Sequence, residues 1–258
     1  MPRNPLRKAA SKRTLATFAR KAREESLVAT NGGLTEHDAA AMAQSHKPEA
    51  FLVCCIDSRF QPAKVLDYGA GIALEHRPIA CVIPPEEKAS ADLLARMAFR
   101  RLNNVSTIVL VSHSDCGGIQ AALKVPRPDE KAANDLHTVA AVVHQSGLDL
   151  GRLGREFLAA EKGDLRRAGD RLSREVAVQS LRNLMGYKGR DGYATVADEV
   201  KAGVLNMMVL YYDLDHRRFE VYDGQKQKWR NAADADMLSM KVQPPASGCA
   251  THANCGGH

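Results

Sequence analysis

The stretch VSTIVLVSHSDCGG, residues 105–118, is the most informative about the fold. It is an apolar run of strand length that ends abruptly in a polar turn with two glycines. Its β-branched residues favour a buried strand. A second apolar run, FLVCC at 51–55, ends in the same way in IDSR. Between the two runs, residues 86–104 have the apolar spacing of an amphipathic helix. The order strand–helix–strand predicts parallel neighbours in a sheet with helices on both faces.

The rest of the chain extends this pattern. We expect a third strand within 72–83 and a helix-rich region over 128–186. Residues 203–223 predict a hairpin, with two strands around the turn DLDHRR. Beyond residue 223 the periodicity is lost, so 224–258 is predicted to be an irregular tail. The predicted fold class is therefore α/β, with a central, mostly parallel sheet flanked by helices.

The positive charge of the chain is concentrated at its N-terminus. The formal net charge is +6, and residues 1–25 carry eight Lys and Arg against two Glu, which equals the whole excess. We predict a basic, partly helical arm over 1–30 that is a solvated leader or a surface for a protein partner, while nucleic acid is disfavoured. An Arg-rich, acid-poor leader is also typical of organelle transit peptides.

Two negative features of the sequence favour a cytoplasmic protein. The N-terminus has no apolar core of a secretory signal, and no apolar run reaches the 18 or so residues of a membrane span. The six cysteines do not have the spacing of a secreted disulfide framework. We therefore expect reduced thiols that are available to bind metal, apart from Cys54 and Cys81, which we assign to packing.

Three metal-ligand side chains follow the ends of the two predicted parallel strands. Cys55 ends one strand, and His113 and Cys116 lie just past the other. The carboxyl ends of parallel strands meet at one edge of the sheet. Two thiolates and one imidazole suit Zn²⁺ and leave its fourth position open, as a catalytic zinc requires. The alternative is that Cys55 is simply a small buried residue. The following glycines, Gly117 and Gly118, are expected to allow a sharp turn and to open the next helix.

Asp57 and Arg59 lie directly after the first predicted ligand. A guanidinium beside a carboxylate can hold it ionised and away from a metal ion. Asp57 could then accept a hydrogen bond from a zinc-bound hydroxide and orient it. The alternative is an ordinary surface ion pair that contributes little.

The two motifs together resemble those of the β-class carbonic anhydrases. C-x-D-S-R, beginning at Cys55, is followed about 55 residues later by H-x-x-C-G-G, beginning at His113. The similarity extends over roughly residues 30–223, and it marks 31–223 as the zinc domain between the arm and the tail.

This resemblance implies a fold and an activity. The expected fold is a four-stranded parallel core extended by another strand, and the expected assembly is a dimer or a tetramer. Zinc would be held by Cys55, His113 and Cys116, with Asp57 and Arg59 beside it. The reaction would be attack of zinc-bound hydroxide on CO₂, giving bicarbonate.

Around the substrate, the sequence departs from the family pattern. The usual RN-x-A-N is RPIAC here, so Arg77 remains while Pro78 and Cys81 replace asparagines. A usual glutamine corresponds to His46, a usual aromatic to Leu74, and a usual tyrosine to about Ala98. The predicted pocket residues are His46, Leu74, Arg77 and Gly117. The departures leave two alternatives open: hydrolysis of COS or CS₂ by the same chemistry, or a non-catalytic zinc protein that acts as a scaffold.

The tail repeats the metal-ligand pattern. The sequence CATHANCGGH spaces its thiols and imidazoles three residues apart, and two Cys with two His form a complete tetrahedral set. The tail is therefore predicted to be a second metal site, or else a peptide that docks on a partner. The candidate ligands are Cys249, His252, Cys255 and His258.

Overall fold

The computed structural model describes residues 46–68, 71–127 and 134–234. All helices and strands of these described residues belong to one compact unit. The core is a six-stranded sheet with the strand order β2-β1-β3-β4-β5-β6. The strands are β1 (Ala50–Cys54), β2 (Ala73–His76), β3 (Thr107–His113), β4 (Asn206–Asp213), β5 (Arg218–Asp223) and β6 (Lys228–Asn231). The first four in spatial order are parallel, and β5 and β6 add antiparallel at one edge.

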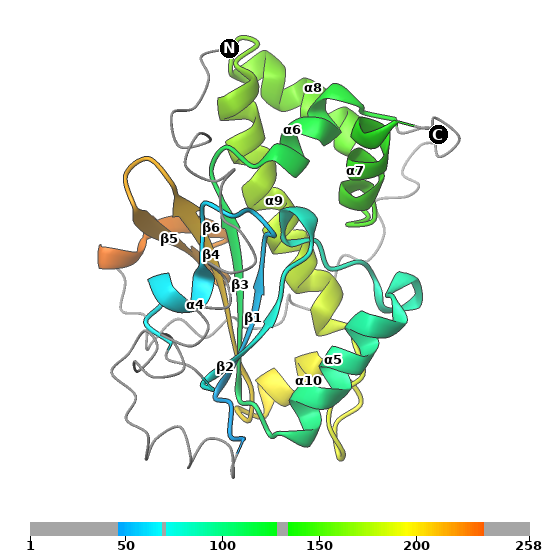
Figure 1. Ribbon diagram of the computed structural model, residues 1–258, viewed down its shortest axis with the longest axis vertical. Coiled ribbons are helices and arrows are strands. Elements are labelled where there is room, and N and C mark those ends of the chain that lie inside the picture. The colour runs from blue at the N-terminus through cyan, green and yellow to red at the C-terminus, as the bar shows by residue number, and fades with distance from the viewer. Residues whose placement is uncertain (1–45, 69–70, 128–133, 235–258) are drawn as a thin grey trace, which may run out of the picture. The chain divides into compact units, whose positions relative to one another are not determined.

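Helices lie on both faces of this sheet (Figure 1). They are α4 (Pro62–Val65), α5 (Ala91–Leu102), α6 (Gly117–Lys124), α7 (Asp135–His144), α8 (Leu150–Ala160), α9 (Leu165–Met185) and α10 (Val196–Lys201). The long α9 packs against β3 and β4, whereas α4 packs against β1. Helices α6, α7 and α8 gather around the end of α9 that lies near the carboxyl end of β3 (Figure 1). The predicted α/β class and the parallel pairing of β1 with β3 are confirmed.

Alternating side chains of β1 enter the hydrophobic cores on the two faces of the sheet. Phe51 and Val53 of β1 point to the face that carries α5 and α9, and Leu52 and Cys54 point to the face that carries α4. This is the two-residue period of an extended strand that is buried on both sides. All five residues of β1 are buried, which explains why its sequence is a continuous apolar run.

The helix predicted over 86–104 is shorter in the structure. Residues Glu86–Lys88 form a single 3₁₀ turn instead. Ser90 has an extended backbone, and its hydroxyl accepts the N–H of Leu93, so it caps α5 and sets the start of the helix at Ala91. The predicted hairpin over 203–223 is confirmed as β4 and β5.

The chain beyond residue 223 is not irregular where the structure describes it. Lys228–Asn231 form β6, which pairs with β5, so the predicted irregular tail from 224 is wrong for these residues. The strand is short and half-exposed, which explains why its periodicity is weak. Its tryptophan, Trp229, packs on Tyr222 with ring centroids 5.4 Å apart, and this contact secures the edge strand. The predicted arm at 1–30 and the four candidate ligands of the tail lie outside the described residues.

A buried ion cluster holds the beginning of β3. The guanidinium of Arg100 lies 2.8 Å from the carboxylate of Glu199, and both side chains are fully buried. Arg190 Nε donates to the other oxygen of Glu199 at 2.8 Å. Both arginines also donate to the carbonyl of Val105, just before the strand. This cluster therefore fixes the end of β3 opposite to His113.

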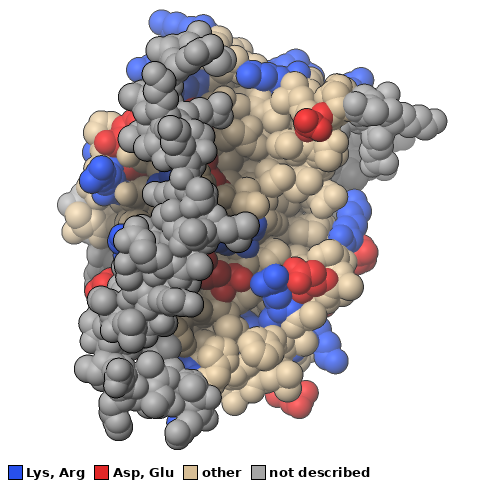
Figure 2. All heavy atoms as spheres, in the orientation of Figure 1, with Lys and Arg blue, Asp and Glu red and all other residues tan. Residues whose placement is uncertain are grey.

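The charged surface of the described body is mixed. Figure 2 shows Lys and Arg interspersed with Asp and Glu on the face that it draws. Within the described ranges, every helix is too short or too polar to cross a bilayer.

Candidate metal centre

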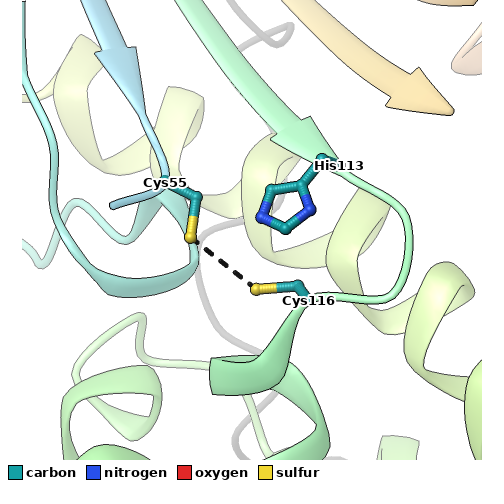
Figure 3. A group of neighbouring side chains, drawn as sticks. All are labelled: Cys55, His113 and Cys116. Carbon is teal, nitrogen blue, oxygen red and sulfur yellow. Dashed lines mark hydrogen bonds between the residues drawn. The ribbon is translucent and has the colours of Figure 1, made fainter. Parts of the chain in front are cut away.

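Three metal-ligand side chains meet at the carboxyl end of β1 and β3. Cys55 follows β1 directly, His113 is the last residue of β3, and Cys116 is the residue that precedes α6. One potential ligand atom from each residue lies within 4.8 Å of the others, and all three residues are buried. The two sulfurs point toward each other beside the imidazole ring (Figure 3). The predicted ligand set is thus brought together by the fold.

The imidazole of His113 is oriented for a ligand at Nε2. Its Nδ1 lies 2.8 Å from the carbonyl oxygen of Ser114, which requires a proton on Nδ1. In the neutral ring Nε2 is then an acceptor, and it is buried without a hydrogen-bond partner among the residues that the structure describes. The hydroxyl of Ser173, on α9, donates to the carbonyl of His113 and fixes the backbone at this point. A buried acceptor without a partner is costly, so it points to a missing ligand.

The two thiols face each other across the cluster. Their sulfurs are 3.8 Å apart, which is far longer than a disulfide. The hydrogen bond from Cys116 is the largest cause of the pKa of about 4 for Cys55, and it acts against burial. The same hydrogen bond raises the pKa of Cys116. The backbone N–H of Ala80 also donates to the sulfur of Cys55, at 3.3 Å. The site therefore stabilises negative charge on Cys55 before any metal is considered.

Asp57 and Arg59 form the predicted pair beside the cluster. Arg59 Nε and Nη2 donate to the carboxylate of Asp57 at 3.0 and 2.8 Å. These hydrogen bonds hold the pKa of Asp57 at about 2, although burial opposes the shift. Asp57 Oδ2 lies 3.9 Å from Nε2 of His113. The carboxylate thus reaches the edge of the cluster while the guanidinium keeps it ionised.

Asp115 also binds Arg59, and the sequence analysis did not identify it. Its carboxylate accepts from Arg59 Nη1 at 2.8 Å, and its carbonyl accepts from Nη2. Asp170 and Gln120 hold Asp115 in turn, through its N–H at 2.8 Å and its carboxylate at 2.6 Å. The acidic residue within the HSDC motif was the feature of the sequence that could have identified this contact. It connects the loop after β3 to the loop after β1.

The two glycines of the HSDCGG loop do not make the turn, contrary to the sequence expectation. The positive φ belongs to Asp115, at 53°, and to neither glycine. Gly118 is required for packing instead, because a Cβ there would lie 2.5 Å from Cγ2 of Ile79. A Cβ on Gly117 would meet nothing within 4 Å. The expectation that Gly117 opens the next helix is confirmed, since α6 begins there.

The structure places the four predicted pocket residues in different surroundings. Arg77 donates to the carbonyls of Cys55, Asp57 and Phe60, so its guanidinium holds the loop after β1. Leu74 packs against the hydrophobic core on the α5 face. His46 is exposed, and Gly117 is exposed next to Cys116. Contact with substrate remains a prediction for all four residues.

Two further cysteines were predicted to serve packing. Cys54 and Cys81 are fully buried, and the thiol of Cys81 donates to the carbonyl of Val53 at 3.2 Å. Burial raises the pKa of both thiols, so they stay neutral. Their packing role is confirmed.

Known proteins are similar to this chain in sequence. The sequence profile of a family described as "Carbonic anhydrase" matches residues 50–219. Beta carbonic anhydrase 5, chloroplastic, of Arabidopsis thaliana is 27% identical over 182 residues, which are 69% of this chain and 56% of that protein. The chain thus spans little more than half the length of that relative.

Solved structures agree with the fold. The β-carbonic anhydrase CcaA has a TM-score of 0.66 at 19% identity, covering 84% of this chain and all of that one. A structure described as one of two tetrameric β-carbonic anhydrases from Sordaria macrospora has a TM-score of 0.58 at 21% identity, covering 80% and 92% of the two chains.

Proposed function

The chain belongs to the β-class of the carbonic anhydrase family, and from that membership we propose that it catalyses the reversible hydration of CO₂ to bicarbonate. The observation that carries the proposal is the buried cluster of Cys55, His113 and Cys116, with Asp57 and Arg59 beside it. A purely structural metal site would have no need of an ionised carboxylate at its edge.

The cluster fits zinc. Zinc binds thiolates and neutral imidazole, and two Zn–S bonds of about 2.3 Å at a tetrahedral angle put the sulfurs about 3.8 Å apart. The observed separation is 3.8 Å, and Nε2 of the neutral His113 ring is an acceptor without a partner in the described ranges. Zinc held by these three residues would lower the pKa of water to about 7, which supplies a nucleophilic oxygen at neutral pH.

The side chains around the cluster would orient the reacting oxygen. Oδ2 of Asp57, ionised because Arg59 holds it, accepts a hydrogen bond from the attacking oxygen and turns a lone pair toward CO₂. Arg59 is fixed from its other side by Asp115, so it cannot swing freely. Arg77 keeps the carbonyls of Cys55 and Asp57 in place, and this sets the position of both side chains.

We also propose that the chain assembles as a dimer or a tetramer. The support is the description of the Sordaria macrospora structure as tetrameric, in a chain of the same fold. Light scattering coupled to size-exclusion chromatography gives the mass directly, and a species of 28.1 kDa would contradict the proposal.

We propose a cytoplasmic location, supported by the four described cysteines, which are free thiols as is usual in a reducing compartment. The description of the Arabidopsis relative as chloroplastic makes an organelle the competing location. Fluorescence imaging of the full chain fused at its C-terminus separates the two, because import into an organelle would refute the proposal.

The decisive experiment is stopped-flow CO₂ hydration at a pH of about 8.5, on protein whose zinc content has been measured. Cys55→Ser removes a proposed ligand, and we expect it to lose both zinc and hydration. Cys54→Ser is the matched control, because it makes the same chemical change one residue away, where the side chain points into the core on the α4 face.

Two results would contradict the proposal. One is zinc-loaded protein with no hydration above background, which would redirect the search to sulfur substrates such as COS or CS₂. The other is a Cys55→Ser variant as active as Cys54→Ser, which would exclude the cluster as the reactive site.

A further inference from the structure

A pocket adjoins the proposed active site. It has a volume of about 620 Å³, within the range of small-molecule sites. Its walls come from the loop after β1, from α4, and from the turn between β4 and β5. None of the three cluster residues is among the described residues that line it, but Arg59 is. The pocket is therefore separate from the metal centre and shares one residue with the pair beside it.

The charges in this pocket are unbalanced. Two of its cations, Lys64 and Arg217, have no carboxylate within ion-pair distance in the described part of the chain. The one acidic side chain of the lining, Asp215, is already paired with Arg166, outside the lining. Two unpaired cations facing one cavity repel each other and attract an anion.

The backbone of the turn that carries Arg217 is fixed by hydrogen bonds. Asp213 accepts the N–H groups of Asp215 and His216 with one carboxylate oxygen, which fixes the turn that carries Arg217. Arg217 has a φ of 52°, so its backbone is held in the left-handed region. A fixed backbone reduces the entropy that this segment loses when a ligand binds.

An aromatic stack supports the same wall. The ring of Tyr212, which lines the pocket, lies 4.8 Å from the ring of Phe60 and 4.8 Å from that of Phe219. Tyr212 is paired in register with His113, so this wall is continuous with the strand that ends at the metal centre. These ring contacts restrain the side chain of Tyr212, so it does not fill the cavity.

We propose that this pocket binds a phosphate dianion, either free phosphate or the phosphate group of a monoester, between Lys64 and Arg217. Two cations without an ion-pair partner among the described residues match the charge of about −2 that a phosphate group carries near neutral pH. The hydroxyl of Ser58 and the amide of Gln61 line the same cavity and can donate to its oxygens. The volume exceeds that of a single phosphate, which leaves space for the organic part of an ester.

The shared wall links this site to the reaction. An anion that accepts a hydrogen bond from Arg59 competes with Asp57 and Asp115 for the same guanidinium. Phosphate should therefore change the rate of hydration. This second part rests on the proposed function, whereas binding itself does not.

Binding is tested first, by isothermal titration calorimetry of zinc-loaded protein with inorganic phosphate and with glycerol phosphate at constant ionic strength. The test variant is Lys64→Gln/Arg217→Gln. The control is Lys124→Gln/Arg155→Gln, which removes the same two charges from exposed positions outside the pocket lining. We expect the test variant to bind at least tenfold more weakly and the control to bind as the wild type does. Tighter binding of the ester would identify a monoester as the ligand, and equal or tighter binding of inorganic phosphate would identify the free ion.

The proposal is overturned if the wild type binds neither ligand at millimolar concentration, or if the test variant binds as tightly as the control. The rate is tested separately, by adding phosphate to the hydration assay. A change in kcat/KM for the wild type and the control, but not for the test variant, would support the link through Arg59. Binding without any such change would refute that link. A protein with no hydration activity would still report phosphate binding, so failure of the proposed function is distinguishable from failure of this site.

Discussion

Replacement of Glu199 by glutamine tests the buried ion cluster at the start of β3. Glu199→Gln keeps the shape of the side chain but removes its charge, which leaves the fully buried guanidinium of Arg100 without a counterion. Loss of one partner from a buried pair costs about 3–5 kcal/mol. Arg190 is one-fifth exposed and can turn toward water, so we expect the lower half of that range, about 3–4 kcal/mol.

The measurement is urea unfolding followed by fluorescence. With a slope of about 2–3 kcal/mol/M, the midpoint should fall by roughly 1–2 M. Asp92→Asn is the control, because it removes a carboxylate from an exposed pair with Arg96 and should cost less than about 1 kcal/mol. If Glu199→Gln costs no more than this control, the reasoning from burial is refuted.

The same cluster predicts a pH dependence. Burial raises the pKa of Glu199, but the hydrogen bonds from Arg100 and Arg190 outweigh it and lower the pKa below its ordinary value. A lowered pKa in the folded state stabilises the protein above the unfolded pKa of about 4.3, and this stabilisation is lost as the pH falls through the folded value. The wild type and Glu199→Gln should therefore differ most at neutral pH and converge below about pH 4.

Three further outcomes are expected. Gly118→Ala should lower stability by about 1–3 kcal/mol because its Cβ collides with Ile79, whereas Gly117→Ala should be tolerated; equal thermal midpoints of the two variants would contradict this. Arg77→Lys should lower hydration on the order of tenfold at unchanged zinc content, because an ammonium cannot hold three carbonyls in the fixed geometry of a guanidinium; full activity of this variant would show that the loop does not need it. Removal of zinc by a chelator should lower the thermal midpoint by about 10 °C, since a ligand at 1,000 times its Kd stabilises by about 4 kcal/mol; an unchanged midpoint would show that the cluster holds no metal.

Much of the fold could be predicted from the sequence, because apolar runs and turns are formed by residues that are neighbours in the chain. Val53 and Leu110 lie in continuous apolar runs, which are typical of strands buried on both faces. The hairpin over 203–223 was predicted from its turn. By contrast, β6 was missed because an edge strand of four residues needs only a few contacts, such as Trp229 on Tyr222, which lie too far apart in sequence to show a period.

The candidate site also has features that the sequence identified and features that only the structure revealed. The sequence by itself determined the identities of Cys55, His113 and Cys116, because thiolate and imidazole chemistry belongs to the residue type and strand ends can be recognised locally. The pairing of Asp57 with Arg59 was also accessible, since the two residues are only two positions apart.

Only the tertiary structure decided how these groups are held. It showed that Asp115 shares Arg59, that Gly118 serves packing rather than the turn, and that Arg77 anchors a loop. It also placed Arg217 opposite residues from more than 150 positions earlier, and so formed a cationic pocket. The physical reason is that hydrogen bonds, steric contacts and electrostatic fields act over a few ångströms in space. They link segments that a linear pattern cannot bring together.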